Sequence, residues 1–332
     1  MGPAMTRLLE QWEPLNLFFT EERQKKKDKG QKVVGDILSR LYDFFRRRTP
    51  RLYVAFYAGM LRLFEVSNAY LQSDSARLHT IKRELWKLHR TLASSILKPA
   101  ALNQGHPWDA NLQNVNIKAP KQRFIGQDAQ ERLDAGVEPF EKTEFFENVT
   151  LFYKTSLKYI RDNLDPRKQE LWMHGEVADI HLTKEKPFSS LTHFTNRFPC
   201  LLPEGVTMDQ LQLEFQDFNC DGELPPANWD QLEPEECWKR LATLKDHKGC
   251  LRFKHLASVM LGILLIPVAN AGCERVFSLV RKTRTDFRAN MSASTLEALL
   301  IIKCHMSGTD CHSVPLSVEL LRKCKRSTSS SD

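Results

Sequence analysis

Apolar residues recur at helical spacing through most of the chain. In residues 34–45, one stripe contains Ile37, Leu38, Leu41, Tyr42 and Phe45, which is the pattern of an amphipathic helix with one buried face. Similar spacing predicts further helices over residues 8–19, 52–71, 78–97 and 140–160. Only residues 52–57 could pass for a strand, and the several apolar β-branched runs of a parallel sheet are missing. The pattern predicts a mainly α fold.

Breaks in this periodicity divide the chain into five parts. Residues 1–98 form a helical region, and 99–139 are polar, with Pro, Gly and Asn, as is typical of a linker or long surface loop. Helical spacing resumes over 140–225, where prolines separate shorter helices. Residues 226–308 form a C-terminal helical block. The serine-rich and charged segment 309–332 is predicted to be a partly disordered tail.

The formal net charge of +7 conceals two basic ends and an acidic middle. Residues 1–100 hold 19 Lys and Arg against 10 acids, 201–250 hold 4 against 11, and 251–332 hold 12 against 6. A polyanion should therefore meet the ends of the chain. Two basic runs near the N-terminus could serve nuclear import or contact nucleic acid, or could be solvated helix ends. They are Lys25, Lys26, Lys27 and Arg46, Arg47, Arg48.

Sequence motifs for common enzyme classes are absent. We find no phosphate-binding glycine loop, no G-x-S-x-G and no H-E-x-x-H. The eight Cys include no C-x-x-C pair, so reduced thiols are expected. The pairs Cys304-His305 and Cys311-His312 do not have the spacing of a zinc finger. We expect no metal, no cofactor, no membrane span and an intracellular protein.

The most informative segment lies near the C-terminus. Asn270 could cap a helix in which Cys273, Val276, Phe277 and Val280 recur at i, i+3, i+4 and i+7, which predicts one buried face. Ser294-x-x-Glu297 fits a capping box before a last helix. This helix carries Leu296, Leu299 and Leu300. Between the two helices lies a basic segment with Arg281, Lys282, Arg284 and Arg288, which is a further candidate for nucleic-acid contact.

These residues also resemble a known family. The motifs are N-A-x-C-E-R-V-F-S over 270–278, R-T-D-x-R over 284–288 and T-L-x-x-L-L-x-x-K over 295–303. Together they look like the C-terminal dimerisation region of hAT (hobo/Activator/Tam3) transposases and their domesticated relatives. The specific resemblance covers about 228–306. A looser one, to the helical insertion region of hAT-derived genes, covers 145–180 and 199–218.

The resemblance implies a degenerate catalytic core. hAT transposases cut DNA with three acids that hold two metal ions in a ribonuclease-H-like fold, and Glu274 corresponds to the third acid. In the family, the two aspartates come from core strands far upstream, and the resemblance implies that this sequence begins after them. We therefore expect the remnant of such a transposase without most of its sheet, and a protein that is not an enzyme. Glu274 is then a vestige of the triad, or simply a carboxylate that favours a helix N-terminus.

The resemblance further implies a function through pairing with itself or a related hAT-derived protein, in the nucleus or otherwise in the cytoplasm. The expected interface residues are Arg275, Val276, Phe277, Val280, Leu296, Leu299 and Leu300. The pattern alone leaves open whether the apolar ones form an internal core instead. Two other functions remain: a fragment of an active DNA transposase that contributes Glu274, and a non-specific nucleic-acid binder acting through the basic ends.

Overall fold

The protein is helical throughout its described residues. A computed structural model describes residues 2–30, 35–73, 75–103, 106–285, 290–305 and 322. It is 72% helical, and these residues include no strand, which confirms the mainly α prediction. The segment 52–57 lies inside a helix. The chain divides into two compact units, Met1–Val268 and Ala269–Asp332.

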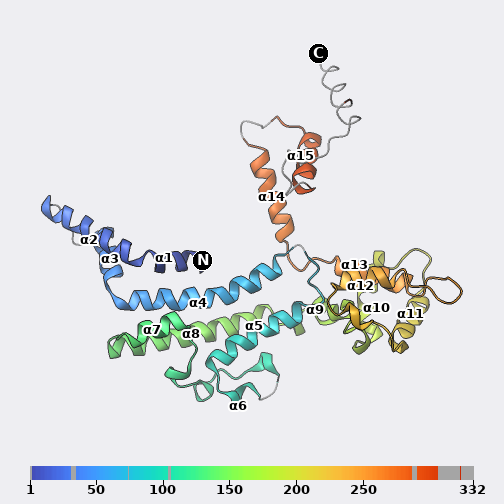
Figure 1. Ribbon diagram of the computed structural model, residues 1–332, viewed down its shortest axis with the longest axis horizontal. Helices are drawn as coiled ribbons and strands as arrows, with labels where there is room; N and C mark the ends of the chain where they lie inside the picture. Colours follow the sequence, from blue (N-terminus) through green and yellow to red (C-terminus); the bar gives the residue numbers. More distant parts are fainter. Residues whose placement is uncertain are drawn as a thin grey trace. The chain divides into compact units, whose positions relative to one another are not determined.

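The first half of unit 1 is built from long helices (Figure 1). Its α-helices are α1 (Gly2–Glu10), α2 (Trp12–Asp28), α3 (Ile37–Arg46), α4 (Arg48–Leu71), α5 (Ile81–Ile96), α6 (Pro99–Leu102), α7 (Gln127–Asp134) and α8 (Pro139–Asn163). Short 3-10 helices are η1 (Pro107–Asp109), η2 (Asn114–Asn116) and η3 (Pro120–Gln122). Helix α3 starts later than its apolar pattern suggested, because the Asp36 carboxylate accepts a hydrogen bond from the Ser39 N–H (2.8 Å) and caps it there.

Buried aliphatic side chains, together with a group of aromatic rings, fill the core between α4, α5 and α8. Phe56 packs edge-on against Phe145, with ring centroids 5.9 Å apart, and Tyr153 lies beside them. A smaller cluster joins the N-terminal helices to α4, with Trp12 donating a hydrogen bond from Nε1 to the Phe45 carbonyl (3.0 Å). Burial of these aliphatic and aromatic side chains is the main force holding the helices together.

Residues 99–139 differ from the linker expected for them. The segment contains α6, η1–η3 and α7, and buries Trp108, Ile117 and Ile125 in the same core. Backbone hydrogen bonds tie it to the end of α5, among them Lys118 N to the Ile96 carbonyl (2.8 Å). Its polar composition hid these few apolar residues, which follow no helical period. The segment is thus an integral part of unit 1.

The second half of unit 1 contains shorter helices. They are η4 (Pro166–Lys168), α9 (Glu170–His174), η5 (Gly175–Ala178), η6 (Thr183–Glu185), α10 (Phe188–Arg197), η7 (Pro199–Leu201), α11 (Met208–Cys220), η8 (Ala227–Trp229), α12 (Pro234–Leu241) and α13 (Lys254–Leu264). Their shared core centres on the fully buried Trp238, which packs against Phe218 and donates a hydrogen bond from Nε1 to the Ala178 carbonyl (2.8 Å).

Unit 2 is a pair of helices, α14 (Ala271–Thr283) and α15 (Ala293–His305), drawn in orange and red in Figure 1. The predicted tail, 309–332, lies outside the described residues except for Arg322. Among the described residues, no helix combines the length and hydrophobicity that a membrane crossing requires.

Candidate functional site

Helix α14 presents apolar side chains on the surface of the single chain. Phe277 is 64% exposed and Val276 is 40% exposed, while Val280 is half-buried. The prediction that this face is buried is therefore wrong for Cys273, Val276 and Phe277 within the chain itself. The i, i+3, i+4 spacing correctly reports an apolar face, but spacing does not say which surface covers it.

Helix α15 adds more apolar surface than the sequence pattern singled out. Ile301 and Ile302 are 52% and 56% exposed, whereas Leu296, Leu299 and Leu300 are half-buried. The available signal was the run 299–302, four consecutive apolar residues that distribute hydrophobic side chains around the helix. A helix that is apolar on several sides has more than one face to cover.

Local contacts at the helix ends differ from the expected caps. Asn270 is in the N-cap position of α14, but its side chain accepts no capping hydrogen bond. At α15, the Ser292 hydroxyl accepts a hydrogen bond from the Thr295 N–H (3.1 Å), so Ser292 caps the helix two residues before the predicted Ser294. Serine fits either position by composition, and the backbone geometry decides between them.

A polar contact joins α14 and α15. The Lys303 ammonium on α15 donates a hydrogen bond to the Thr283 hydroxyl at the end of α14 (2.8 Å). Thr283 is the buried residue of α14. This bond lies at the C-terminal ends of the two helices. The apolar side chains of residues 276 and 277, nearer the start of α14, are on the surface.

Glu274 lies exposed in the first turn of α14. There its carboxylate is next to the positive end of the helix dipole. The described residues contain no group of three or more His, Cys, Asp or Glu side chains that could hold a metal ion. The favourable interaction with the helix dipole is therefore a sufficient explanation for a glutamate at this position.

The basic residues around α14 are exposed. Arg275, Arg281, Lys282 and Arg284 lie on or directly after the helix, and Arg288 lies outside the described residues. Cations in the last turn favour the negative end of the helix dipole. Basic residues of the same helix therefore lie before and after the apolar residues 276 and 277.

The two basic runs of the N-terminal region lie on different helices. Lys25, Lys26 and Lys27 are on α2, whereas Arg46 ends α3 and Arg48 begins α4, and several members of the runs are already paired. Lys25 bonds Glu22 (2.7 Å) and holds the pKa of that carboxyl below its usual value, and Lys26 bonds Asp36 (2.8 Å). Arg48 donates to the Ala135 carbonyl (3.1 Å).

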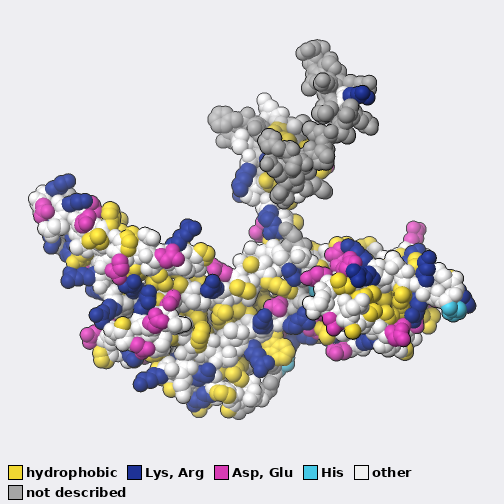
Figure 2. All heavy atoms as spheres, in the orientation of Figure 1, with side chains coloured by type: hydrophobic (Ala, Val, Ile, Leu, Met, Phe, Trp, Pro, Cys, Tyr) yellow, Lys and Arg dark blue, Asp and Glu magenta, His cyan; other side chains and the backbone are white. Residues whose placement is uncertain are grey.

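The remaining residues of these two runs do not form a basic patch that would indicate a nucleic-acid site. Arg46 donates to the Tyr42 hydroxyl, while Lys27 and Arg47 are exposed. Figure 2 shows acidic and hydrophobic side chains among the blue Lys and Arg over α2 and α3. This surface is of mixed charge.

Comparison with known families places part of α11 and the helices α12 to α15 in one region. Residues 213–306 match the hAT family C-terminal dimerisation region. The match confirms the resemblance drawn from the motifs and supports a hAT-family, transposase-derived protein. It begins within α11, before residue 226 where we expected the block to start. No curated protein and no solved structure matches the chain.

The matched region thus has two structural components. Residues of α11, α12 and α13 belong to the core of unit 1, with Trp238 and Phe253 among its fully buried side chains. Helices α14 and α15 form the described part of unit 2 and carry the exposed apolar residues. A dimerisation region with an uncovered apolar surface is the candidate functional site of this chain.

Proposed function

We propose that the protein is a non-catalytic, hAT-derived protein that works by pairing with a second copy, or with a related protein, through α14 and α15. The observation that carries the proposal is the exposure of Val276, Phe277, Ile301 and Ile302 within a region that matches a dimerisation family. Large exposed apolar side chains in a cluster mark interaction surfaces.

The energy of association would come from burying this surface. An interface of ordinary size removes about 800 Å² from water on each partner. A well-packed aromatic anchor often dominates the binding energy, and Phe277 is the aromatic side chain of the surface. Arg275, Lys282 and the other cations of α14 would lie at the rim, where water screens their charge. Leu296, Leu299 and Leu300 would support the interface from their half-buried positions.

The non-catalytic part of the proposal rests on the setting of Glu274. Two-metal DNA cleavage requires several carboxylates that converge on one point. Glu274 is exposed on α14, and the residues next to it in sequence, Cys273 and Arg275, are not acidic. A nuclear location also stays part of the proposal, and rests on the two basic runs, 25–27 and 46–48.

Size-exclusion chromatography with light scattering tests the pairing. We expect twice the chain mass at micromolar concentration, and the single-chain mass for the double variant Phe277→Asp, Ile302→Asp, because two buried carboxylates would be left without partners. Val66→Asp is the matched control. Val66 is 68% exposed on α4, so this variant should remain a dimer.

Two results would overturn the proposal. One is a wild-type chain that elutes at the single-chain mass throughout the micromolar range. The other is a double variant that is still a dimer while its circular dichroism is unchanged. Metal-dependent cleavage of DNA by the purified chain, abolished by Glu274→Ala, would instead support the transposase-fragment alternative.

A further inference from the structure

A long groove runs along α8 in unit 1, far along the chain from the dimerisation region. One wall is α8 from Pro139 to Lys154, and the other is the segment 114–123 that contains η2 and η3. The groove has a volume of about 1050 Å³. Fifteen residues of helix rise by about 22 Å, so the groove follows roughly four turns of α8.

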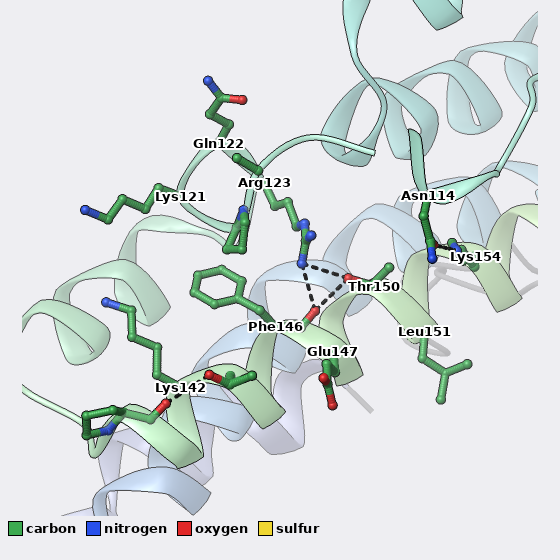
Figure 3. Close-up of a pocket in the computed structure, with 14 residues that line it drawn as sticks. Asn114, Lys121, Gln122, Arg123, Lys142, Phe146, Glu147, Thr150, Leu151 and Lys154 are labelled. Carbon is green, nitrogen blue, oxygen red and sulfur yellow. Dashed lines mark hydrogen bonds between the residues drawn. The ribbon is translucent and has the colours of Figure 1, made fainter. Parts of the chain in front are cut away.

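The opposite wall is fixed in place by hydrogen bonds. Arg123 donates from Nη1 to the Phe146 carbonyl (3.1 Å) and to the Thr150 hydroxyl (2.9 Å), which joins the two walls (Figure 3). The Tyr153 hydroxyl, whose pKa burial raises to about 12, donates to the Phe124 carbonyl (2.8 Å). The groove is therefore a preformed feature that an incoming ligand would not have to organise.

Apolar side chains lie in and around the groove. The Phe146 ring lies between the two walls in Figure 3, and Leu151, at the other end, is 62% exposed. Three further apolar lining residues, Ala119, Pro120 and Pro139, are exposed. Apolar surface of this extent suits a partner rather than water.

Positive charge surrounds this apolar surface. Lys121 and Arg123 belong to one wall, Lys142 and Lys154 to the other, and Glu147 is the acidic residue among the lining. Arg123 and Lys154 are engaged, the latter with Asn114 (2.8 Å). In the described part of the chain, no carboxylate forms an ion pair with Lys121 or Lys142. Figure 3 shows both side chains extending at the same end of the groove.

We propose that this groove binds an acidic amphipathic helix of a partner protein. Its apolar residues, spaced i, i+3, i+4 and i+7, would lie along Leu151 and the exposed Pro120 and Pro139, and its carboxylates would pair with Lys121 and Lys142. The four-turn length of the groove and its excess of cations select this occupant. A helix laid into an apolar groove is a common mode of peptide recognition.

Nucleic acid fits the groove less well. Strand binding combines cations with exposed rings on which bases stack. Here the aromatic ring of the lining, Phe146, is only 4% exposed, and Leu151 occupies a position where a phosphate backbone would meet hydrocarbon. Desolvating phosphates against such a surface is unfavourable.

Peptide selection on the full-length chain tests the proposal. The probe is a displayed library of 16-residue helical peptides with one apolar face, in which each flanking position is either Glu or Lys. Peptides that bind the Lys121→Glu, Lys142→Glu variant are removed first. We expect the survivors to be rich in Glu, and to lose at least tenfold in affinity to that variant. Lys158→Glu, an exposed charge reversal one turn beyond the groove, should change affinity less than twofold.

Leu151→Lys separates apolar docking from charge attraction. It adds a positive charge but removes an apolar contact, so it should weaken peptide binding; stronger binding would contradict the proposal. Survivors rich in Lys, no survivors, or equal affinity for the charge-reversed variant would also overturn it. So would a 20-nucleotide single-stranded DNA that binds more weakly to that variant while the peptides do not. Circular dichroism of each variant verifies that its helices are intact.

Discussion

His89 is the most strongly perturbed histidine of the described chain. It is 2% exposed on α5, and its ring lies 4.7 Å from that of Trp108. Its Nδ1 has no hydrogen-bond partner among the described residues. Burial, reinforced by the nearby Arg161, lowers its pKa to about 4. The folded protein therefore holds this side chain neutral at pH values where an unfolded chain would protonate it.

This difference predicts an acid sensitivity that one substitution removes. The unfolded chain binds a proton near pH 6.5 and the folded one only near pH 4, so stability falls as the pH drops through this window. Between pH 7.5 and 4.5 the His89 contribution is roughly 2–3 kcal/mol. Urea denaturation at both pH values should show His89→Phe losing that much less stability than wild type. Equal losses would show that His89 is protonated in the folded state.

Individual side chains also mark the limit of what the sequence could predict. The apolar character of Val276 and Phe277 was readable, but not their exposure, since that depends on whether α15 or a second molecule covers them. His89 was not singled out, because a histidine on a helical stripe gives no sign of its burial until Trp108, from a segment without periodicity, packs on it.

Helix α13 depends on a cap supplied from another helix. Its own N-cap residue, Phe253, provides no side-chain hydrogen bond. Glu214 of α11 supplies one instead: Oε2 accepts from the N–H groups of His255 (3.0 Å) and Leu256 (2.8 Å), and Oε1 lies 2.6 Å from His255 Nδ1. A carboxylate at a helix N-terminus satisfies free N–H groups and interacts favourably with the helix dipole.

Glu214→Gln should therefore destabilise unit 1 although it preserves the shape of the side chain. The neutral amide loses the charge-assisted bonds to the helix N-terminus and to His255, and we expect the free energy of unfolding to fall by about 1–2 kcal/mol. Urea denaturation at pH 7 measures it. Glu204→Gln, at an exposed position, should change stability by less than about 0.5 kcal/mol. Similar losses in both variants would argue against the capping role.

Helices were predictable where one apolar stripe determines them, whereas their ends were not. α8 follows its apolar period closely, but α3 begins later than its pattern suggests because Asp36 caps it. The cap of α13 could not be predicted, because Glu214 and His255 are 41 residues apart and meet only in the folded core. At α15, two serines were equally suitable in sequence, and only the backbone places Ser292 at the cap.

At the scale of the whole chain, the division into units differs from the one that composition suggested. Residues 99–139 read as a linker, yet the structure builds them into the core of unit 1, and the two units divide after Val268. Composition counts polar residues, but burial of Trp108, Ile117 and Ile125 is sufficient to fix a polar segment. The candidate dimerisation site was predictable because its motifs are local. The groove along α8 was not, since its walls come from separate segments.

The division after Val268 leads to a prediction about the whole molecule. A chain ending at Val268 keeps the three buried clusters of unit 1 but lacks α14 and α15. It should retain helical circular dichroism and cooperative thermal unfolding, and light scattering should give the single-chain mass. A chain ending at His305 is the control and should remain a dimer. A dimeric 1–268 chain would place the association surface in unit 1. Loss of cooperative unfolding would mean that the large core formed by α4, α5 and α8 requires the C-terminal helices, although its buried side chains all lie before residue 268.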